Sequence, residues 1–210
     1  AIAPLPALNN GYVTFGCFNN PTKMGDPVVA LWAKILAAVP ESRLMLKAKQ
    51  FGDASIVHDT LERFAQRGIE AERIILQGES MRTDYLASYN AVDIALDPFP
   101  FTGGTTSIEG LWMGVPFITR RGDRLIARQG ESILQNMGLA DWIVDDDASY
   151  IDLAVTRANN LHELAELRTT LRARLLTSPL CDAPRFARDF EAALTGMWRE
   201  YADKNAPANG

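Results

Sequence analysis

Cysteine and histidine are scarce in this sequence of 210 residues, and their scarcity excludes most metal centres. The chain has two cysteines, Cys17 and Cys181, and two histidines, His58 and His162. Neither cysteine belongs to a Cys-x-x-Cys pair and the histidines are isolated, so the spacing that holds zinc is missing. A disulfide between the two cysteines is one pairing that the sequence allows. We expect no metal in this protein.

Positive charge and long apolar runs are also in short supply. Lysine and arginine total 21 against 26 acidic residues, which gives a formal net charge of −5. A nucleic-acid surface would need a basic stripe, so any anion must be held locally. No apolar run approaches the roughly 18 to 20 residues that cross a bilayer, and the N-terminus lacks the order of a secretory signal. We therefore expect a soluble, cytoplasmic protein that binds neither nucleic acid nor membrane.

Three familiar motifs are missing. The Gly-x-Gly-x-x-Gly fingerprint is absent after the first expected strand, where residues 16–20 read Gly-Cys-Phe-Asn-Asn. Nothing matches the glycine-rich lysine loop of P-loop NTPases, and no serine sits on a nucleophile elbow. These absences argue against an NAD dehydrogenase, a P-loop enzyme or a Ser-His-Asp hydrolase.

What the sequence does contain is an alternation of short, β-rich apolar runs with helical patterns. The chain is 47% hydrophobic, enough to bury the core of one large domain. The alternation predicts a Rossmann-like, doubly wound α/β domain with a helical C-terminal extension, whose ligands lie beyond the carboxyl ends of the strands. The expected strands are 12–18, 43–46, 73–76, 92–96, 116–119 and 142–144. The expected helices are 26–39, 54–67, 83–90, 105–113, 128–137, 150–159, 161–176 and 185–201.

The two ends of the chain are expected to lie outside this domain. Residues 1–10 contain two prolines and no initiator methionine, and they predict a stiffened linker. Residues 11–203 form the predicted domain with its C-terminal helices, and residues 204–210 are expected to be a frayed tail. We expect the chain to be a piece of a longer protein.

The most informative segment is 97–116. An apolar strand ends in a proline-rich corner, passes through Gly-Gly at 103–104, and enters a helix whose first residues, 105–107, carry hydroxyls. Glycines let a backbone approach a ligand, and the free N–H groups of a helix N-terminus favour phosphate. Glu109, one turn later, could accept hydrogen bonds from the two hydroxyls of a ribose. The segment therefore predicts a nucleotide site.

Each part of this motif also has an ordinary structural explanation. Gly-Gly before a helix can be a turn, Thr or Ser at a helix start is commonly a cap, and a carboxylate there can simply be solvated. The combination of all three at the end of a buried strand favours the ligand site. Lys23, in the loop after the first strand, is the best-placed cation for a diphosphate, although alone it would be read as a solvated lysine. Lower-ranked residues at the same edge are Lys47, Lys49, Gln50, Gln77, Gly78, Glu79 and Arg82.

The sequence resembles the C-terminal catalytic half of the protein O-GlcNAc transferase and SPINDLY family. The resemblance rests on residues 11–20, Lys23, residues 97–116 and Ser-Pro-Leu-Cys at 178–181. Members are inverting glycosyltransferases of the two-Rossmann GT-B architecture, usually preceded by tetratricopeptide repeats. The resemblance implies that this chain binds the nucleotide sugar. It also implies that a second Rossmann half and the repeats, on sequence not present here, hold the protein acceptor.

The same resemblance implies roles for single residues. Lys23 becomes the catalytic cation that holds the donor diphosphate and supports the leaving group. Thr105 and Thr106 match a threonine pair that binds the phosphates, and Glu109 matches an acidic residue that holds the ribose.

Three positions depart from the O-GlcNAc transferases. Asn20 falls where they have a diphosphate-contacting glutamine, and Arg82 falls near a lysine of their cleft. Gly104 stands where they carry histidine, whereas SPINDLY-like members have glycine before their threonine run. The likeness is therefore closer to the SPINDLY branch, which includes protein O-fucosyltransferases that use GDP-fucose.

These observations favour one function and leave two alternatives open. The first is transfer of GlcNAc from UDP-GlcNAc to Ser or Thr hydroxyls of proteins; the others are transfer from GDP-fucose and a non-catalytic module that binds a nucleotide sugar. In an inverting transfer, negative charge builds on the departing diphosphate, which Lys23 and the helix N-terminus would stabilise. No carboxylate cluster for Mg²⁺ or Mn²⁺ is evident. We expect the chain to be inactive without its N-terminal half.

Overall fold

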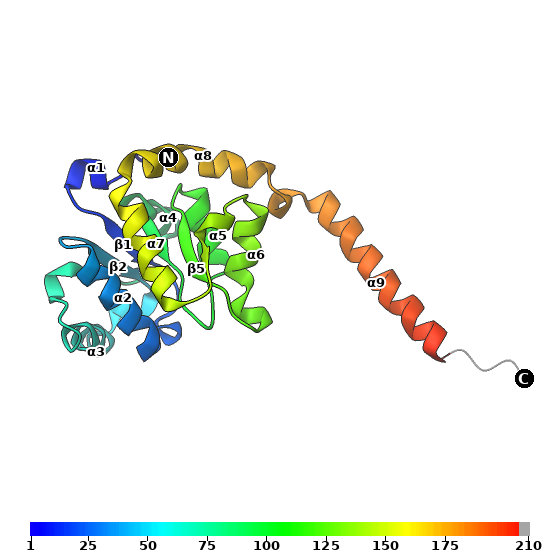
Figure 1. Cartoon of the computed structure of the whole chain (residues 1–210), viewed down its shortest axis with the longest axis horizontal. Helices are drawn as coiled ribbons and strands as arrows, with labels where there is room; N and C mark the ends of the chain where they lie inside the picture. The colour runs from blue at the N-terminus through cyan, green and yellow to red at the C-terminus, as the bar shows by residue number, and fades with distance from the viewer. Residues whose placement is uncertain (206–210) are drawn as a thin grey trace, which may run out of the picture.

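The computed structural model describes residues 1–205 and contains one six-stranded, fully parallel sheet with helices on both faces (Figure 1). The strand order is β3-β2-β1-β4-β5-β6. This order reverses between β1 and β4, which makes the carboxyl ends of these two strands the topological switch point where open α/β sheets bind ligands. The strands are β1 (Thr14–Cys17), β2 (Arg43–Lys47), β3 (Ile74–Gln77), β4 (Ile94–Leu96), β5 (Phe117–Arg120) and β6 (Ile143–Val144).

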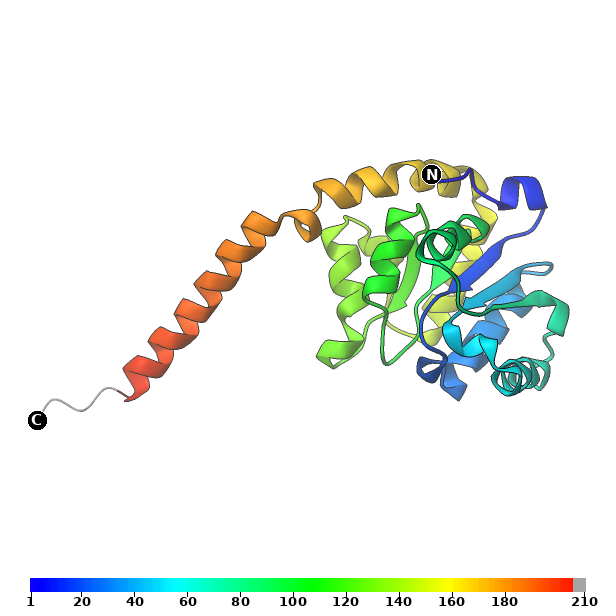
Figure 2. The same ribbon diagram turned by 180° about the vertical axis from the view of Figure 1, so that it is seen from behind.

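The helices connect successive strands and cover the sheet from both sides. Figure 1 shows α2 and α7 in front of the sheet, and Figure 2 shows α4 and α5 in front of it from the opposite side. The helices are α1 (Ala7–Asn10), α2 (Asp26–Ala38), α3 (Ala54–Ala65), α4 (Arg82–Ser88), α5 (Thr105–Trp112), α6 (Gln129–Asn136), α7 (Asp147–Asn159), α8 (Leu161–Thr177) and α9 (Ala183–Asn205). Each predicted strand and helix has a counterpart here, so the predicted doubly wound fold is confirmed.

The strands are apolar along their length because both faces of the sheet are covered. All four residues of β1 are buried. The helix α2 begins at Asp26 and Pro27, since the helix dipole favours an acid in the first turn and proline is tolerated there. Its inner face packs on the sheet and on α7 through Val28, Val29, Leu31, Trp32, Ile35 and Leu36.

Residues 1–10 differ from the linker expected of them, because they pack against the domain. Leu5 and Ala7 are both 2% exposed, and α1 is a short helical turn that the sequence did not predict. The N–H of Ala7 donates to the carboxylate of Asp93 at 2.9 Å. The prolines had suggested a linker, but the apolar residues between them belong to the core.

A buried polar cluster closes the amino edge of the sheet. Asp93 also accepts a hydrogen bond from the N–H of Thr14 at 2.8 Å. Arg168, from α8, donates to the carbonyls of Ala3 at 2.9 Å and Val92 at 2.8 Å. Burial raises the pKa of Asp93 to about 6, against the lowering effect of its two N–H donors and of Arg168. The cluster ties the N-terminal segment, β1 and α8 to the start of β4.

The last helix, α9, leaves the domain and buries none of its residues (Figures 1 and 2). The helix expected at 185–201 is present, and no other part of the described chain covers its apolar side chains. Residues 204 and 205, expected in the frayed tail, are helical, and residues 206–210 of that expected tail lie outside the described residues. Among residues 1–205, no helix is both long and apolar enough to cross a membrane. The exposed large apolar side chains of α9 are Phe186, Phe190, Leu194, Met197, Trp198 and Tyr201.

Candidate functional site

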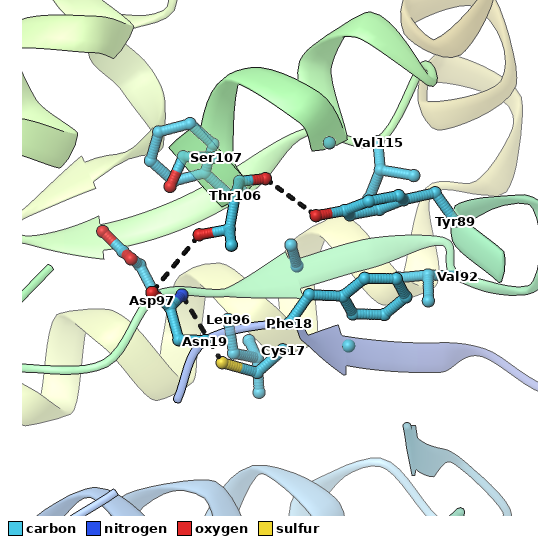
Figure 3. Close-up of a pocket in the computed structure, with 14 residues that line it drawn as sticks. Cys17, Phe18, Asn19, Tyr89, Val92, Leu96, Asp97, Thr106, Ser107 and Val115 are labelled. Carbon is cyan, nitrogen blue, oxygen red and sulfur yellow. Dashed lines mark hydrogen bonds between the residues drawn. The ribbon is translucent and has the colours of Figure 1, made fainter. Parts of the chain in front are cut away.

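The candidate site lies at the carboxyl ends of β1 and β4. The loop after β1 supplies Asn19 and Lys23, and the loop after β4 runs from Asp97 to the first turn of α5. A small pocket lies under this turn, between the two strands and the 3₁₀ turn Tyr89–Ala91 (Figure 3). Its polar lining comes from Cys17, Asn19, Tyr89, Asp97, Thr106 and Ser107.

Lys23 is held in place by neutral groups. Its Nζ donates to Asn19 Oδ1 and to the carbonyl of Thr102, both at 3.0 Å, and lies 3.8 Å from the centre of the Phe101 ring. It forms no ion pair with any carboxylate in residues 1–205. Partial burial lowers the pKa of Lys23, although the nearby charge of Asp97 acts to raise it. Its positive charge is therefore available to an anion.

The N-terminus of α5 is open. Gly104 occupies the position before the helix and no side chain caps it. The first helical hydrogen bonds are those from Ser107 and Ile108 to the carbonyl of Gly104, at 3.1 Å each, so the N–H groups of Thr105 and Thr106 come before them. The alternative that these threonines merely cap the helix is not what the structure shows. Four things converge here: a glycine, two free N–H groups, two hydroxyls and the positive end of a helix dipole.

Thr106 and Lys23 share one partner. The Thr106 hydroxyl donates to Asn19 Oδ1 at 3.2 Å, the same oxygen that accepts from Lys23. The hydroxyl of Tyr89 donates to the carbonyl of Thr106 at 2.9 Å. Thr105 is exposed, one residue earlier in the same turn. Asn19 thus joins the lysine loop to the helix N-terminus.

Glu109 is buried in the second turn of α5 and is not solvated. Its Oε1 accepts from Arg82 Nη1 at 2.6 Å, and its Oε2 accepts from the hydroxyl of Tyr85 at 3.0 Å. The side chain of Arg82 is 66% exposed, whereas that of Glu109 is 11% exposed. Burial is the main cause that raises the pKa of Tyr85 to about 12, and the charge of Glu109 adds to it. The structure therefore brings Arg82 and Glu109 together.

The side chain of Asn20 forms no hydrogen bond with the Lys23 side chain or with the N-terminus of α5. Its Oδ1 accepts from the N–H of Thr22 at 3.0 Å and from the Thr22 hydroxyl at 3.1 Å, which begins the 3₁₀ turn Pro21–Lys23. The neighbouring Asn19 points into the site instead. The sequence showed two adjacent asparagines at the end of a strand, and only the conformation of the loop decides which of them faces inward.

Asp97 belongs to the site and was missed as a functional residue. It is 3% exposed, and its Oδ1 accepts from the N–H of Gly103 at 2.6 Å. Its Oδ2 accepts from the hydroxyl of Thr119 at 2.7 Å. Burial raises the pKa of Asp97 to about 7, against the lowering effects of Thr119, Gly103 and Lys23. The signal in the sequence was its position as the first residue after an apolar strand.

Two glycines make room for the bonds of Asp97. A Cβ on Gly103 would lie 2.3 Å from Ser107 Oγ and 3.0 Å from Asp97 Oδ1. A Cβ on Gly130 would lie 2.3 Å from Thr119 Oγ1 and 2.5 Å from Asp97 Oδ2. Any side chain at either position would therefore displace the carboxylate or its donors.

The lower-ranked residues contribute less. Lys47 Nζ donates to Gln77 Oε1 at 3.2 Å and to the carbonyl of Gly78 at 3.3 Å, so it joins the ends of β2 and β3. Lys49 and Glu79 are exposed. No group of three or more potential metal-ligating side chains occurs within residues 1–205.

The two cysteines are free thiols in the structure, so the disulfide that the sequence allowed is not formed. Cys17 is buried at the end of β1, whereas Cys181 is exposed before α9. The two histidines, His58 and His162, lie on the exposed faces of α3 and α8 and take no part in the site.

An open parallel sheet with an uncapped helix N-terminus at its switch point is the architecture of one half of a GT-B glycosyltransferase. The structure aligns with a K341M mutant of the Thermobaculum terrenum O-GlcNAc transferase at a TM-score of 0.89 and 38% identity, over 98% of this chain and 39% of the other. An Anabaena protein, Alr3699/HepE in complex with UDP and glucose, shares the fold at a TM-score of 0.59 and 14% identity, over 88% of this chain and 49% of the other.

The chain belongs to glycosyl transferase family 41, whose model matches residues 5–190. It is 41% identical over 208 residues to the SPINDLY protein of Oryza sativa subsp. japonica, named a probable UDP-N-acetylglucosamine–peptide N-acetylglucosaminyltransferase, covering 99% of this chain and 22% of the relative. It is 32% identical to the SEC protein of Arabidopsis thaliana, which carries the same activity in its name, over 92% of this chain and 20% of the relative. The chain thus spans about a fifth of these relatives, and the predicted family is confirmed.

Proposed function

We propose that this chain is the donor-binding half of an inverting protein O-glycosyltransferase that transfers GlcNAc from UDP-GlcNAc to Ser or Thr hydroxyls. The family supplies the class of reaction, whereas the donor, the acceptor and the site residues are part of the proposal. One observation carries it. The Lys23 ammonium and the open N-terminus of α5 are joined through Asn19 at the switch point of the sheet, and neither is neutralised by a carboxylate of the described chain.

The geometry suits a leaving diphosphate. Its oxygens would accept from the N–H groups and hydroxyls of Thr105 and Thr106 and from Lys23. When the acceptor hydroxyl attacks the anomeric carbon, the bond to the phosphate oxygen breaks and negative charge builds on the diphosphate. Preorganised donors stabilise that charge most where water is excluded. The acceptor gives its proton to a base that we place on the N-terminal half of the longer protein.

Glu109 would hold the ribose. Both ribose hydroxyls can donate to its carboxylate, provided that the exposed guanidinium of Arg82 leaves Oε1. Tyr85 can stay on Oε2 and keep the carboxylate oriented. Arg82, once released, would be free to pair with a negatively charged donor, since its side chain is 66% exposed. Asn20 supports the turn that carries Lys23 and does not itself contact the diphosphate in this proposal.

A second donor, GDP-fucose, is favoured by one observation. The observation is the closer likeness to the SPINDLY branch, for which the sequence resemblance implies this donor: the chain is 41% identical to rice SPINDLY and 32% to Arabidopsis SEC, both of which are themselves named UDP-GlcNAc transferases. A non-catalytic module that binds the same ligands is the remaining alternative. The three hypotheses differ in the base that is bound and in whether a sugar is transferred.

Calorimetric titration of the chain with UDP, GDP, UDP-GlcNAc and GDP-fucose tests the proposal. We expect UDP and UDP-GlcNAc to bind. Binding of GDP and GDP-fucose alone would show that the donor is GDP-fucose. Binding of none of the four would overturn the proposed function. Adding the N-terminal half of the longer protein should then produce transfer of labelled sugar to a peptide. If it does not, the chain is a binding module.

A further inference from the structure

Asp97 is a buried carboxyl group directly under the proposed diphosphate site. It is 3% exposed, so it is not placed to touch a ligand. Its carboxylate accepts two hydrogen bonds from different elements: Oδ1 accepts from the N–H of Gly103 in the loop before α5, and Oδ2 accepts from the hydroxyl of Thr119 on β5. The hydroxyl of Tyr150, from α7, donates to the Asp97 carbonyl at 3.1 Å and fixes the backbone of the same residue.

The anchored turn also holds the cation. Thr102 directly precedes Gly103, and its carbonyl accepts from Lys23 at 3.0 Å. Its hydroxyl donates to the carbonyl of Ile126 at 3.1 Å and accepts from the N–H of Gly130 at 3.3 Å. A shift of the Gly103 peptide would therefore displace both the start of α5 and one of the two oxygens that hold the Lys23 ammonium.

We propose that Asp97 is the positioning residue of the donor site, because its carboxyl group fixes the Gly103 turn and through it both the Lys23 ammonium and the N-terminus of α5. This inference rests on the proposed function and names a residue for which neither the motif nor the family resemblance gave a role. A misplacement of about 1 Å is enough to weaken contacts of this kind strongly. The close fit of Gly103 and Gly130 around the carboxylate supports the same conclusion, since both positions leave space only for hydrogen.

The charge of Asp97 gives the proposal a pH signature. The titratable groups around it are Lys23 from the loop after β1, Cys17 from β1 and Tyr150 from α7, with the neutral Thr119 on β5. With a pKa of about 7, Asp97 ionises near neutral pH. A bound diphosphate brings negative charge close to it and favours its protonated form, whose carbonyl oxygen still accepts from the Gly103 N–H and so keeps the turn in place. Affinity for a nucleotide sugar, whose diphosphate does not titrate in this range, should therefore fall as the pH rises through 7.

The test measures the affinity for UDP-GlcNAc and GDP-fucose by calorimetry between pH 5.5 and 8.5, in the parent chain and in variants. Asp97→Ala removes both acceptor oxygens and should weaken binding about tenfold or more. Asp97→Asn keeps one oxygen for the Gly103 N–H, so it should bind nearly as tightly as the parent chain does at low pH. Its affinity should not change with pH near 7. Asp93→Asn is the matched control: it is an equally buried carboxyl at the other end of β4, and its substitution should leave the binding profile unchanged.

Thr119 provides a second test if Asp97→Ala does not fold. Thr119→Val removes the hydroxyl that donates to Asp97, which should raise the pKa of Asp97 and move the midpoint of the binding profile to higher pH. Thr119→Ser keeps the hydroxyl and should leave the midpoint in place. If the parent binds its donor and neither Asp97→Asn nor Thr119→Val changes the pH profile, this inference fails alone. If the parent binds no nucleotide at any pH, the proposed function fails and this inference fails with it.

Discussion

Asp93 and Asp97 lie at the two ends of β4 and share most of their properties, yet they serve opposite edges of the sheet. Both are buried, and burial raises the pKa of Asp93 to about 6 and that of Asp97 to about 7. Asp93 is bonded to backbone N–H groups of the N-terminal segment and β1, near the charge of Arg168. Asp97 is bonded to a loop and a hydroxyl, near the charge of Lys23.

The two cations explain the difference. Arg168 is fully buried and donates to backbone carbonyls, so its charge is used inside the fold. Lys23 is half-buried, is held by neutral oxygens and keeps its charge for an outside partner. We therefore expect the amino edge to contribute mainly to stability and the carboxyl edge to bind the ligand, as in other open α/β sheets.

The largest effect should come from Arg168→Met. It leaves the carbonyls of Ala3 and Val92 without their donor, at about 1 to 3 kcal/mol of unfolding free energy each, and it removes the positive charge near buried Asp93. Urea denaturation measures this loss, with exposed Arg174→Met on the same helix as the control. The affinity of the folded fraction for nucleotide should not change. A loss below about 1 kcal/mol would show that the amino edge is not the stabilising one.

Lys23→Ala should have the opposite effect: it should weaken nucleotide binding and leave the stability of the domain nearly unchanged. Removing a charged donor from a bound diphosphate weakens affinity by about 1.5 to 3 kcal/mol, or about ten- to a hundredfold. The unfolding free energy should be nearly unchanged, because the cation makes no ion pair in the described chain. Lys34→Ala, an exposed lysine on α2, is the control. Unaltered calorimetric affinity for UDP and GDP would remove Lys23 from the site.

The double variant Thr105→Ala and Thr106→Ala tests the helix N-terminus. Loss of two neutral hydroxyl contacts should weaken nucleotide binding by about 1 to 2 kcal/mol. Since neither side chain caps α5, thermal stability should change less than the cost of a lost cap, which is about 1 kcal/mol. Thr169→Ala, exposed on α8, is the control. A drop in melting temperature with full affinity would return both residues to a structural role.

The smallest effect concerns Glu109. If its carboxylate accepts from both ribose hydroxyls, the parent should prefer a ribonucleotide over its 2′-deoxy analogue by about 1 kcal/mol, or about fivefold. Glu109→Ala should erase most of this preference, while Glu166→Ala, at an exposed position on α8, should keep it. If the parent chain binds UDP and 2′-deoxy-UDP equally well, and GDP and 2′-deoxy-GDP equally well, Glu109 does not hold the ribose.

The sheet and the start of α5 could be predicted because their signals are local. Buried parallel strands are apolar along their length, and the glycines and hydroxyls before α5 are contiguous in the chain. The pairing of Arg82 with Glu109 could not be predicted, since 27 residues separate them and only the packing of α4 on α5 brings them together. The choice between Asn19 and Asn20 depends on the rotation of a few peptide units. The roles of Asp97 and of residues 1–10 likewise depend on partners distant in sequence.

The backbone hydrogen bonds of α9 and those of the domain should stay closed for very different times. A helix of 23 residues rises about 34 Å, and with no buried residue it depends on its own hydrogen bonds rather than on tertiary packing. Helices of this kind open and close on the microsecond scale, whereas the buried face of α8 opens only with the domain. We therefore expect the amide hydrogens of α9 to exchange with solvent deuterons within the shortest labelling times, and those around the buried Leu171 and Leu175 to stay protected until the sheet itself unfolds.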